Sequence, residues 1–164
     1  MRRSWIQTIG LLTLILITIA LTTGCSKTIA ISGEQADDFR EQVKQDYPAI
    51  EKMTLAFEPL TFRMTYVFKE PLDEKEKENL FEDSRRFLMS DQFNEEIIQS
   101  PKIAKYFSSG HPNFSVVFRI ENPESVSRFE LHANNEKNAD PVYRQWYYAE
   151  DDEALGEPYV EENK

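Results

Sequence analysis

The residue whose chemistry stands out is Cys25, the only cysteine among the 164 residues of the chain. It follows Leu21, two threonines and Gly24, so small side chains lead up to its thiol. A deprotonated thiol is the nucleophile that forms thioether bonds, and Gly24 leaves the neighbouring backbone accessible. The chain offers this thiol no disulfide partner, so in an exported protein it would be either free or capped by a covalent modification.

The other residue types that carry catalysis form no recognisable set. His111 lies between a glycine and a proline, and His132 falls on the polar side of a predicted strand, so neither has partners at zinc-ligand spacing. Glycosidase chemistry needs two carboxylates a few ångströms apart, and no pair is singled out. The acidic run 150–153 lacks the alternating ligands and central glycine of a calcium loop. We therefore expect a protein that is not an enzyme and holds no metal or cofactor; a cell-envelope enzyme using acidic residues or His111 is the alternative.

The residues before Cys25 have the order of a secretory signal. Arg2 and Arg3 precede a charge-free and mostly aliphatic run from Ile9 to Leu21, and small residues follow. That run is shorter than the roughly twenty residues that a helix needs to cross a bilayer. We therefore expect residues 1–24 to be a signal peptide rather than a retained membrane span.

The step from Leu21 to Cys25 resembles the lipobox of bacterial prolipoproteins, in which small or aliphatic residues precede Gly and Cys. The resemblance covers residues 1–25 only, and Thr22 stands where the class usually has leucine. It implies that a diacylglycerol is attached to Cys25, with palmitate among the acyl chains, and that residues 1–24 are removed. Two acyl chains hold a protein stably on a bilayer. The implied location is the outer face of the cytoplasmic membrane, with a Gram-positive source favoured by composition.

The charge of the chain argues against one class of partner and favours another. Removal of residues 1–24 takes away two arginines and no acidic residue, which changes the formal net charge from −10 to −12. Such a surface is repelled by nucleic-acid phosphates, so we expect no nucleic-acid binding. The same charge predicts that the domain stands off anionic lipids on a tether over residues 25–31. A basic protein is the partner that it would attract.

Hydrophobic periodicity predicts the first half of the domain. A helix capped by Ser32 and ended by Pro48 presents an apolar stripe. Alternating apolar residues predict strands over 52–58 and 60–68, joined by a tight turn. Asp73 with Glu76 forms a capping-box pattern that begins a long helix, and shorter helical segments follow from Ser90 and from Ser100-Pro101.

Alternating apolar residues in the second half of the domain predict a three-stranded meander, with strands near 114–121, 125–133 and 142–149. An acidic tail over residues 151–164 follows. The fold class is therefore α+β, with an antiparallel sheet of about five strands, helices on one face and the order α-β-β-α-β-β-β. Residues 32–150 are expected to form one domain.

The last predicted strand supplies a candidate binding surface. Arg144, Trp146 and Tyr148 share one of its faces, and Tyr143 and Tyr147 share the other. Only one face can meet the helices, so the other would present large aromatic side chains, which are common at binding hot spots. Alternatively, both faces are covered.

These features predict a membrane-anchored extracytoplasmic lipoprotein whose domain binds a protein or peptide without catalysis. A second hypothesis is an inhibitor or exclusion factor that neutralises a cationic envelope-acting protein by electrostatic attraction. An enzyme of the cell envelope and a structural part of a larger envelope assembly are the remaining hypotheses.

Overall fold

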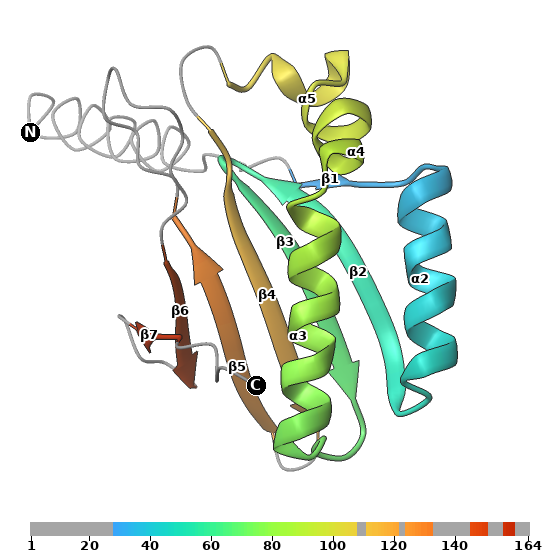
Figure 1. Ribbon diagram of the computed structural model, residues 1–164, viewed down its shortest axis with the longest axis vertical. Helices are drawn as coiled ribbons and strands as arrows, with labels where there is room; N and C mark the ends of the chain where they lie inside the picture. The colour runs from blue at the N-terminus through green and yellow to red at the C-terminus, as the bar shows by residue number, and fades with distance from the viewer. Residues whose placement is uncertain (1–27, 108–110, 122–123, 133–144, 151–155, 160–164) are drawn as a thin grey trace, which may run out of the picture.

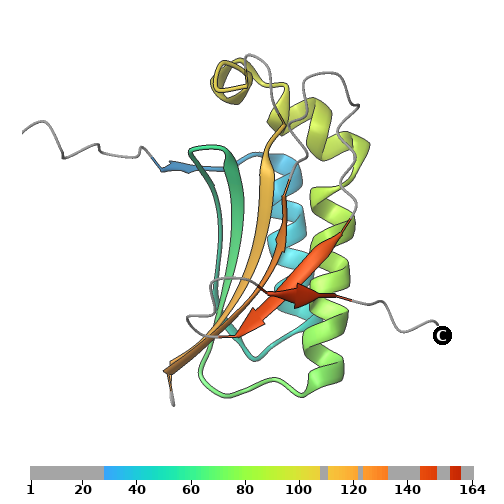
Figure 2. The same cartoon turned by 90° about the vertical axis from the view of Figure 1, so that its left-hand side faces the viewer.

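The computed structural model describes residues 28–107, 111–121, 124–132, 145–150 and 156–159. These residues form two layers, a twisted sheet and a layer of helices packed on one of its faces (Figure 1 and Figure 2). The predicted signal peptide and Cys25 lie outside the described residues.

The sheet contains seven strands in the described part of the chain, and their spatial order follows their order in the sequence. The strands are β1 (Ile29–Ala30), β2 (Ile50–Glu58), β3 (Thr61–Phe68), β4 (Asn113–Glu121), β5 (Glu124–Leu131), β6 (Trp146–Glu150) and β7 (Glu157–Pro158). All neighbours pair antiparallel except β3 and β4, which are parallel. The α+β class and the helices on one face match the prediction. The count of about five strands, the element order α-β-β-α-β-β-β and the fully antiparallel pairing are wrong, because β1 precedes α2, β7 follows β6, and β3 and β4 are parallel.

The parallel pair follows from the connection between its strands. After Phe68 the chain returns along the sheet as helix α3 (Glu74–Leu88) and re-enters the sheet at Asn113. Thr61 therefore pairs with Asn113 and Phe68 with Ile120, in the same direction. A strand, a helix and a second strand joined in this way form a crossover, which parallel pairing requires.

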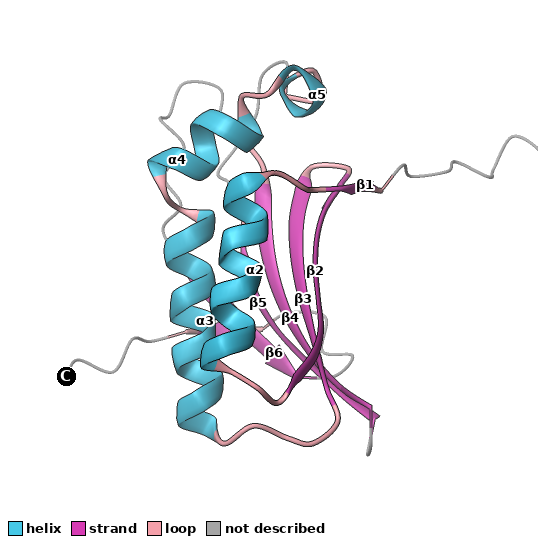
Figure 3. Cartoon of the chain, turned by 90° about the vertical axis from the view of Figure 1, so that its right-hand side faces the viewer, coloured by secondary structure: helices cyan, strands magenta, loops and turns pink. Residues whose placement is uncertain are grey.

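The helical layer consists of α3 and of helix α2 (Glu34–Asp46), which lie side by side over the sheet (Figure 3). The cap of α2 is Gly33 rather than the predicted Ser32, and no side chain caps this helix. Gly33 has a φ of 150°, a conformation that glycine adopts most readily. At the start of α3 the predicted capping box is confirmed, because Asp73 accepts from the Glu76 amide at 2.7 Å and the Glu76 side chain reaches back.

Three short helical segments follow α3. They are α4 (Asp91–Phe93), the π-helical turn η1 (Asn94–Ile98) and α5 (Pro101–Ala104). Ser90 caps α4, which confirms the predicted break at this residue, and Pro101 occupies the first turn of α5 as expected. The chain therefore changes direction repeatedly before it reaches β4.

The core between the layers is rich in aromatic rings. Phe81 of α3 stacks on Phe129 of β5 with 3.8 Å between ring centroids, and it meets the ring of Trp146 edge-on at 5.1 Å. Phe39 of α2 stacks on Phe87 of α3 at 4.2 Å, which joins the two helices. The aromatic core thus holds the helices to the sheet and to each other.

Both ends of the described domain differ from the prediction. The expected tether over 25–31 is shorter, because Ile29 and Ala30 pair with Phe57 and Ala56 as an edge strand and Ile29 is buried. The expected frayed tail over 151–164 is wrong for residues 156–159, where Tyr159 packs its ring 5.0 Å from that of Phe81. The Tyr159 amide also donates to the carbonyl of Trp146 at 2.8 Å. The folded unit therefore extends beyond residues 32–150 in both directions.

Candidate functional site

The residues of the predicted aromatic surface are divided between the core and the outside. Trp146 is 8% exposed and faces Phe81, so it belongs to the core. Tyr147 is 38% exposed on the opposite face of the sheet. Arg144 and Tyr143 fall among the residues that the structure does not describe. Among the described residues of β6, Tyr147 alone presents an exposed aromatic ring, so they form no aromatic patch.

Tyr148 is half-buried on the helix side, where it joins β6 to α3. The Tyr148 hydroxyl donates to Glu150 at 2.6 Å and accepts from the Lys77 ammonium at 2.5 Å. The same ammonium lies 4.8 Å from the centroid of the Tyr148 ring. Burial, followed by the hydrogen bond to Glu150, raises the pKa of the Tyr148 phenol above its usual value. Tyr148 therefore serves packing and hydrogen bonding within the fold.

The sheet face opposite the helices carries charged side chains. Arg63 pairs with Glu58 at 3.3 Å, and Arg128 pairs with Glu130 at 3.4 Å. Ion pairs near the surface contribute little to stability. These two pairs explain the presence of Arg63 and Arg128 on this face without a ligand.

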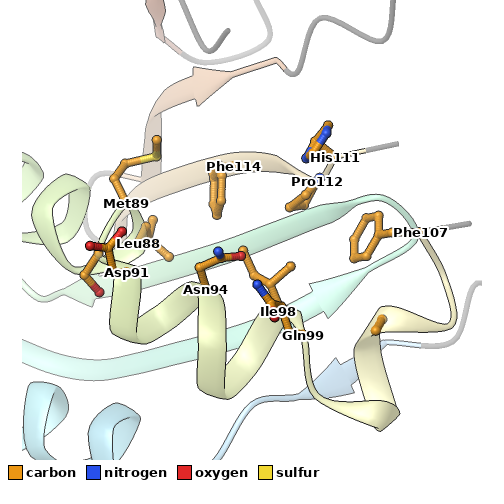
Figure 4. Close-up of a pocket in the computed structure, with 12 residues that line it drawn as sticks. Leu88, Met89, Asp91, Asn94, Ile98, Gln99, Phe107, His111, Pro112 and Phe114 are labelled. Atoms are coloured by element: carbon orange, nitrogen blue, oxygen red, sulfur yellow. The ribbon is translucent and has the colours of Figure 1, made fainter. Parts of the chain in front are cut away.

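A pocket of about 650 Å³ lies between the helical segments that follow α3 and the start of β4 (Figure 4). Ile98, Phe107 and Phe114 supply apolar walls, and Asn94 and Gln99 supply amide groups. Its size falls in the range of small-ligand and peptide-side-chain pockets, which combine apolar walls with a few polar groups. This pocket is therefore a candidate binding site.

The π turn η1 forms one wall of this pocket. The amide of Gln99 donates to the carbonyl of Asn94 at 2.9 Å, a bond that spans five residues and widens the helix. Phe93 and Ile97 anchor the turn in the core, and the ring of Phe93 lies 5.2 Å from that of Phe62. Asn94 and Ile98 are thereby left to line the pocket, as Figure 4 shows. Such turns occur frequently at functional sites.

The ionisable residues of the pocket do not form a reactive pair. Asp91 and His111 lie at opposite ends and do not point toward each other (Figure 4). No group of three or more histidine, cysteine or acidic residues suited to a metal ion occurs in the part of the chain that the structure describes. The pocket therefore offers apolar surface and amide groups, with one carboxylate, Asp91, at its end, which suit a partly apolar ligand.

A smaller pocket of about 290 Å³ lies beside the N-terminal turn of α3. Its one cation is shared by two carboxylates, because the Lys77 ammonium lies 3.8 Å from a Glu74 oxygen and 3.9 Å from a Glu150 oxygen. The three groups together carry one net negative charge, and the Lys77 ammonium links α3 to β6.

Comparison with protein-family models, with characterised proteins and with solved structures yields no significant match for this chain. None of the helices in the described ranges combines the length and the apolar composition that crossing a bilayer requires. The functional interpretation therefore depends on the residues and geometry of this chain.

Sequence reasoning singled out His111 but missed the pocket around it. The available signal was the division of residues 90–112 by Ser90, Ser100 and Pro101 into short helical pieces, since repeated changes of direction produce concave surfaces. The π turn itself has no such sequence signature.

Proposed function

We propose that the protein is a lipid-anchored lipoprotein on the outer face of the cytoplasmic membrane, and that its domain binds a protein or peptide without catalysing a reaction. The lipobox-like step ending at Cys25 supports the anchor. The observation that carries the binding role is the pocket between η1, α5 and β4, with its apolar walls and neutral amides. The separation of Asp91 from His111 in this pocket favours binding over acid–base catalysis (Figure 4).

The chemistry of the lining defines the ligand class. Ile98, Phe107 and Phe114 form a surface for an apolar side chain. The exposed amides of Asn94 and Gln99 both donate and accept hydrogen bonds, so they can pair with the backbone of an extended segment. A peptide segment with one or two apolar side chains and no net charge fits this site.

Photo-crosslinking tests the location of the binding site. A photoreactive phenylalanine analogue replaces Gln99 at the pocket, and in a matched control it replaces Gln45 on the exposed surface of α2. We expect a discrete adduct in intact cells from position 99 and none from position 45. The adduct should disappear when Asn94→Arg places a bulky cation at the pocket. Equal labelling from both positions, or an adduct that survives Asn94→Arg, would contradict the proposal.

A cationic partner is a second candidate, because the helical layer concentrates negative charge. Helix α2 carries five acidic residues and two basic ones, and α4 with η1 carries three acidic residues and no basic one. An exposed surface of this kind attracts basic proteins in a salt-dependent manner. The double variant Asp38→Asn with Glu41→Gln should weaken binding to a lysozyme-like hydrolase, whereas the charge-neutral pocket change Ile98→Ala should not. Binding that is insensitive to salt would argue against this candidate.

A further inference from the structure

Strand β1 brings the folded domain close to the proposed anchor. Only residues 26–28 separate Cys25 from Ile29, which pairs with Phe57 in the sheet. Four residue steps span at most about 14 Å when fully extended. If Cys25 carries lipid as proposed above, this edge of the sheet must lie within that distance of the headgroups.

Two other segments of the chain lie beside β1 at this surface. The turn between β2 and β3 presents Leu60, and the segment around α5 presents Lys102, Lys105 and Tyr106; we call these four residues the anchor corner. The segments lie at the same end of the molecule (Figure 1 and Figure 3). Their contacts join them, because the Lys102 ammonium lies 3.5 Å from the Ala30 carbonyl and the Tyr106 ring lies 5.4 Å from that of Phe57.

The anchor corner is apolar and basic in an acidic chain. Leu60 is 54% exposed and Tyr106 is 39% exposed. Lys102 and Lys105 are exposed, and neither forms an ion pair with a carboxylate among the described residues. No acidic residue occurs in the sequence between Glu96 and Glu121. Two acidic groups lie close to β1: Glu58 at the end of β2, which pairs with Arg63 at 3.3 Å, and the exposed Glu34 at the start of α2. Asp91, Glu95 and Glu96 lie on α4 and η1, away from β1 (Figure 3).

Leu60 is not explained by the fold. Its φ of 69° lies in the left-handed region, where glycine and asparagine are favoured. More than half of its surface is exposed, so core packing does not require leucine. A residue that breaks a local rule without a packing gain points to function.

We propose that the anchor corner rests on an anionic lipid surface, with Leu60 and Tyr106 in the headgroup region and Lys102 and Lys105 among the phosphates. Aromatic rings and lysines are the residue types that favour membrane interfaces. Net charge predicted repulsion, but charges are screened beyond about 8 Å at physiological salt. Lysines at the contact therefore act on the lipid more strongly than acidic residues on remote parts of the domain. The pocket shares Ala104 and Phe107 with this segment and therefore lies beside the bilayer, where it meets membrane-proximal ligands.

Single-cysteine labelling tests this orientation in the lipidated protein. Cys25 is the only native cysteine and its sulfur is occupied by lipid, so an introduced cysteine is labelled uniquely. Fluorophores are attached at Leu60→Cys, Tyr106→Cys and, as control, Ala49→Cys, which is exposed in the turn after α2 at the other end of the domain. The protein is placed in phosphatidylglycerol-containing vesicles that carry a headgroup quencher. We expect strong quenching at 60 and 106 and several-fold less at 49.

Charge removal gives a second readout. With the label on Tyr106→Cys, Lys102→Gln and Lys105→Gln should each lower the ratio of lipid-bound to free anchor corner by roughly fivefold on anionic vesicles. On pure phosphatidylcholine they should have little effect. Vesicle-bound protein that shows equal quenching at 49, 60 and 106 would overturn the orientation. Protein that carries no lipid and does not float with vesicles would instead contradict the anchor itself.

Discussion

A buried hydrogen bond between β3 and α3 allows the packing of the two layers to be tested quantitatively. Tyr66 and Ser84 are both fully buried, and their hydroxyl oxygens lie 2.8 Å apart. The Ser84 hydroxyl donates to the carbonyl of Leu80 at 2.6 Å, so it accepts from the Tyr66 phenol. Burial raises the pKa of Tyr66, which keeps the phenol protonated and able to donate.

The variants Tyr66→Phe, Ser84→Ala and their combination form a double-mutant cycle. Each single change removes one buried bond and leaves a partner less satisfied, so each should lower the free energy of unfolding by about 1–2 kcal/mol. The double variant replaces both groups by apolar ones, so its loss should be smaller than the sum of the single losses by about 1 kcal/mol. Met64, whose sulfur lies 2.8 Å from the Tyr66 hydroxyl, limits the loss in Ser84→Ala.

Urea unfolding of the mature domain measures these differences, with an unchanged slope expected for every variant. As control, Tyr66→Phe is combined with Ser32→Ala, at an exposed serine before α2, and these two effects should add. Additivity within about 0.5 kcal/mol for the Tyr66 and Ser84 pair would refute the contact between α3 and β3.

Three further predictions concern the same fold. Tyr159→Ala should lower the free energy of unfolding by about 1–2 kcal/mol in urea titrations, because its half-buried ring packs on Phe81; an unchanged midpoint would mean that residues 156–159 do not dock. Asp73→Ala should lower the free energy of unfolding by about 1 kcal/mol in the same assay, whereas Asp73→Ser should keep most of the stability that the cap contributes. Equal losses in the two variants would argue against the capping box. The pKa values of Tyr47, Tyr66 and Tyr148 are raised in the fold above the usual 10.0. As pH rises, the unfolded chain therefore loses these protons before the folded chain does. Stability should be level just below about pH 10 and fall above it, as measured by thermal melts. A rise in stability above pH 10 would contradict the burial of these phenols.

Local patterns in the sequence were sufficient to predict most elements. The β2–β3 hairpin, the capping box at Asp73, the break at Ser90 and the meander from β4 to β6 are all confirmed. These features depend on alternation, caps and turn residues, which act over a few positions.

Features that depend on distant parts of the chain were missed. Strands β1 and β7 have two residues each, too few for any alternation to be detected. Alternation also identifies which side chains of β4 face the helices but not the direction in which β4 runs beside β3. That direction follows from the crossover through α3, so the connection between the strands contained information that the strand patterns did not.

The candidate site was predictable only in part. Trp146 and Tyr147 were correctly placed on opposite faces of β6, but the choice of buried face depends on the helices that pack there. The pocket depends on a widened turn at Asn94 that tertiary contacts of Phe93 and Ile97 hold in place. The anchor corner depends on tertiary structure, because the fold brings the β2–β3 turn and α5, which are far apart in sequence, to the same end of the molecule as β1 (Figure 1).

The most direct test of the account is the fate of a Cys25→Ser variant. In cells fed labelled palmitate, the native protein should incorporate label, lose residues 1–24 and sediment with membranes. The variant should incorporate none, keep its leader and be released or mislocalised. Native protein without label, or a variant that is processed and held on membranes like the native chain, would contradict the central claim of lipid anchoring.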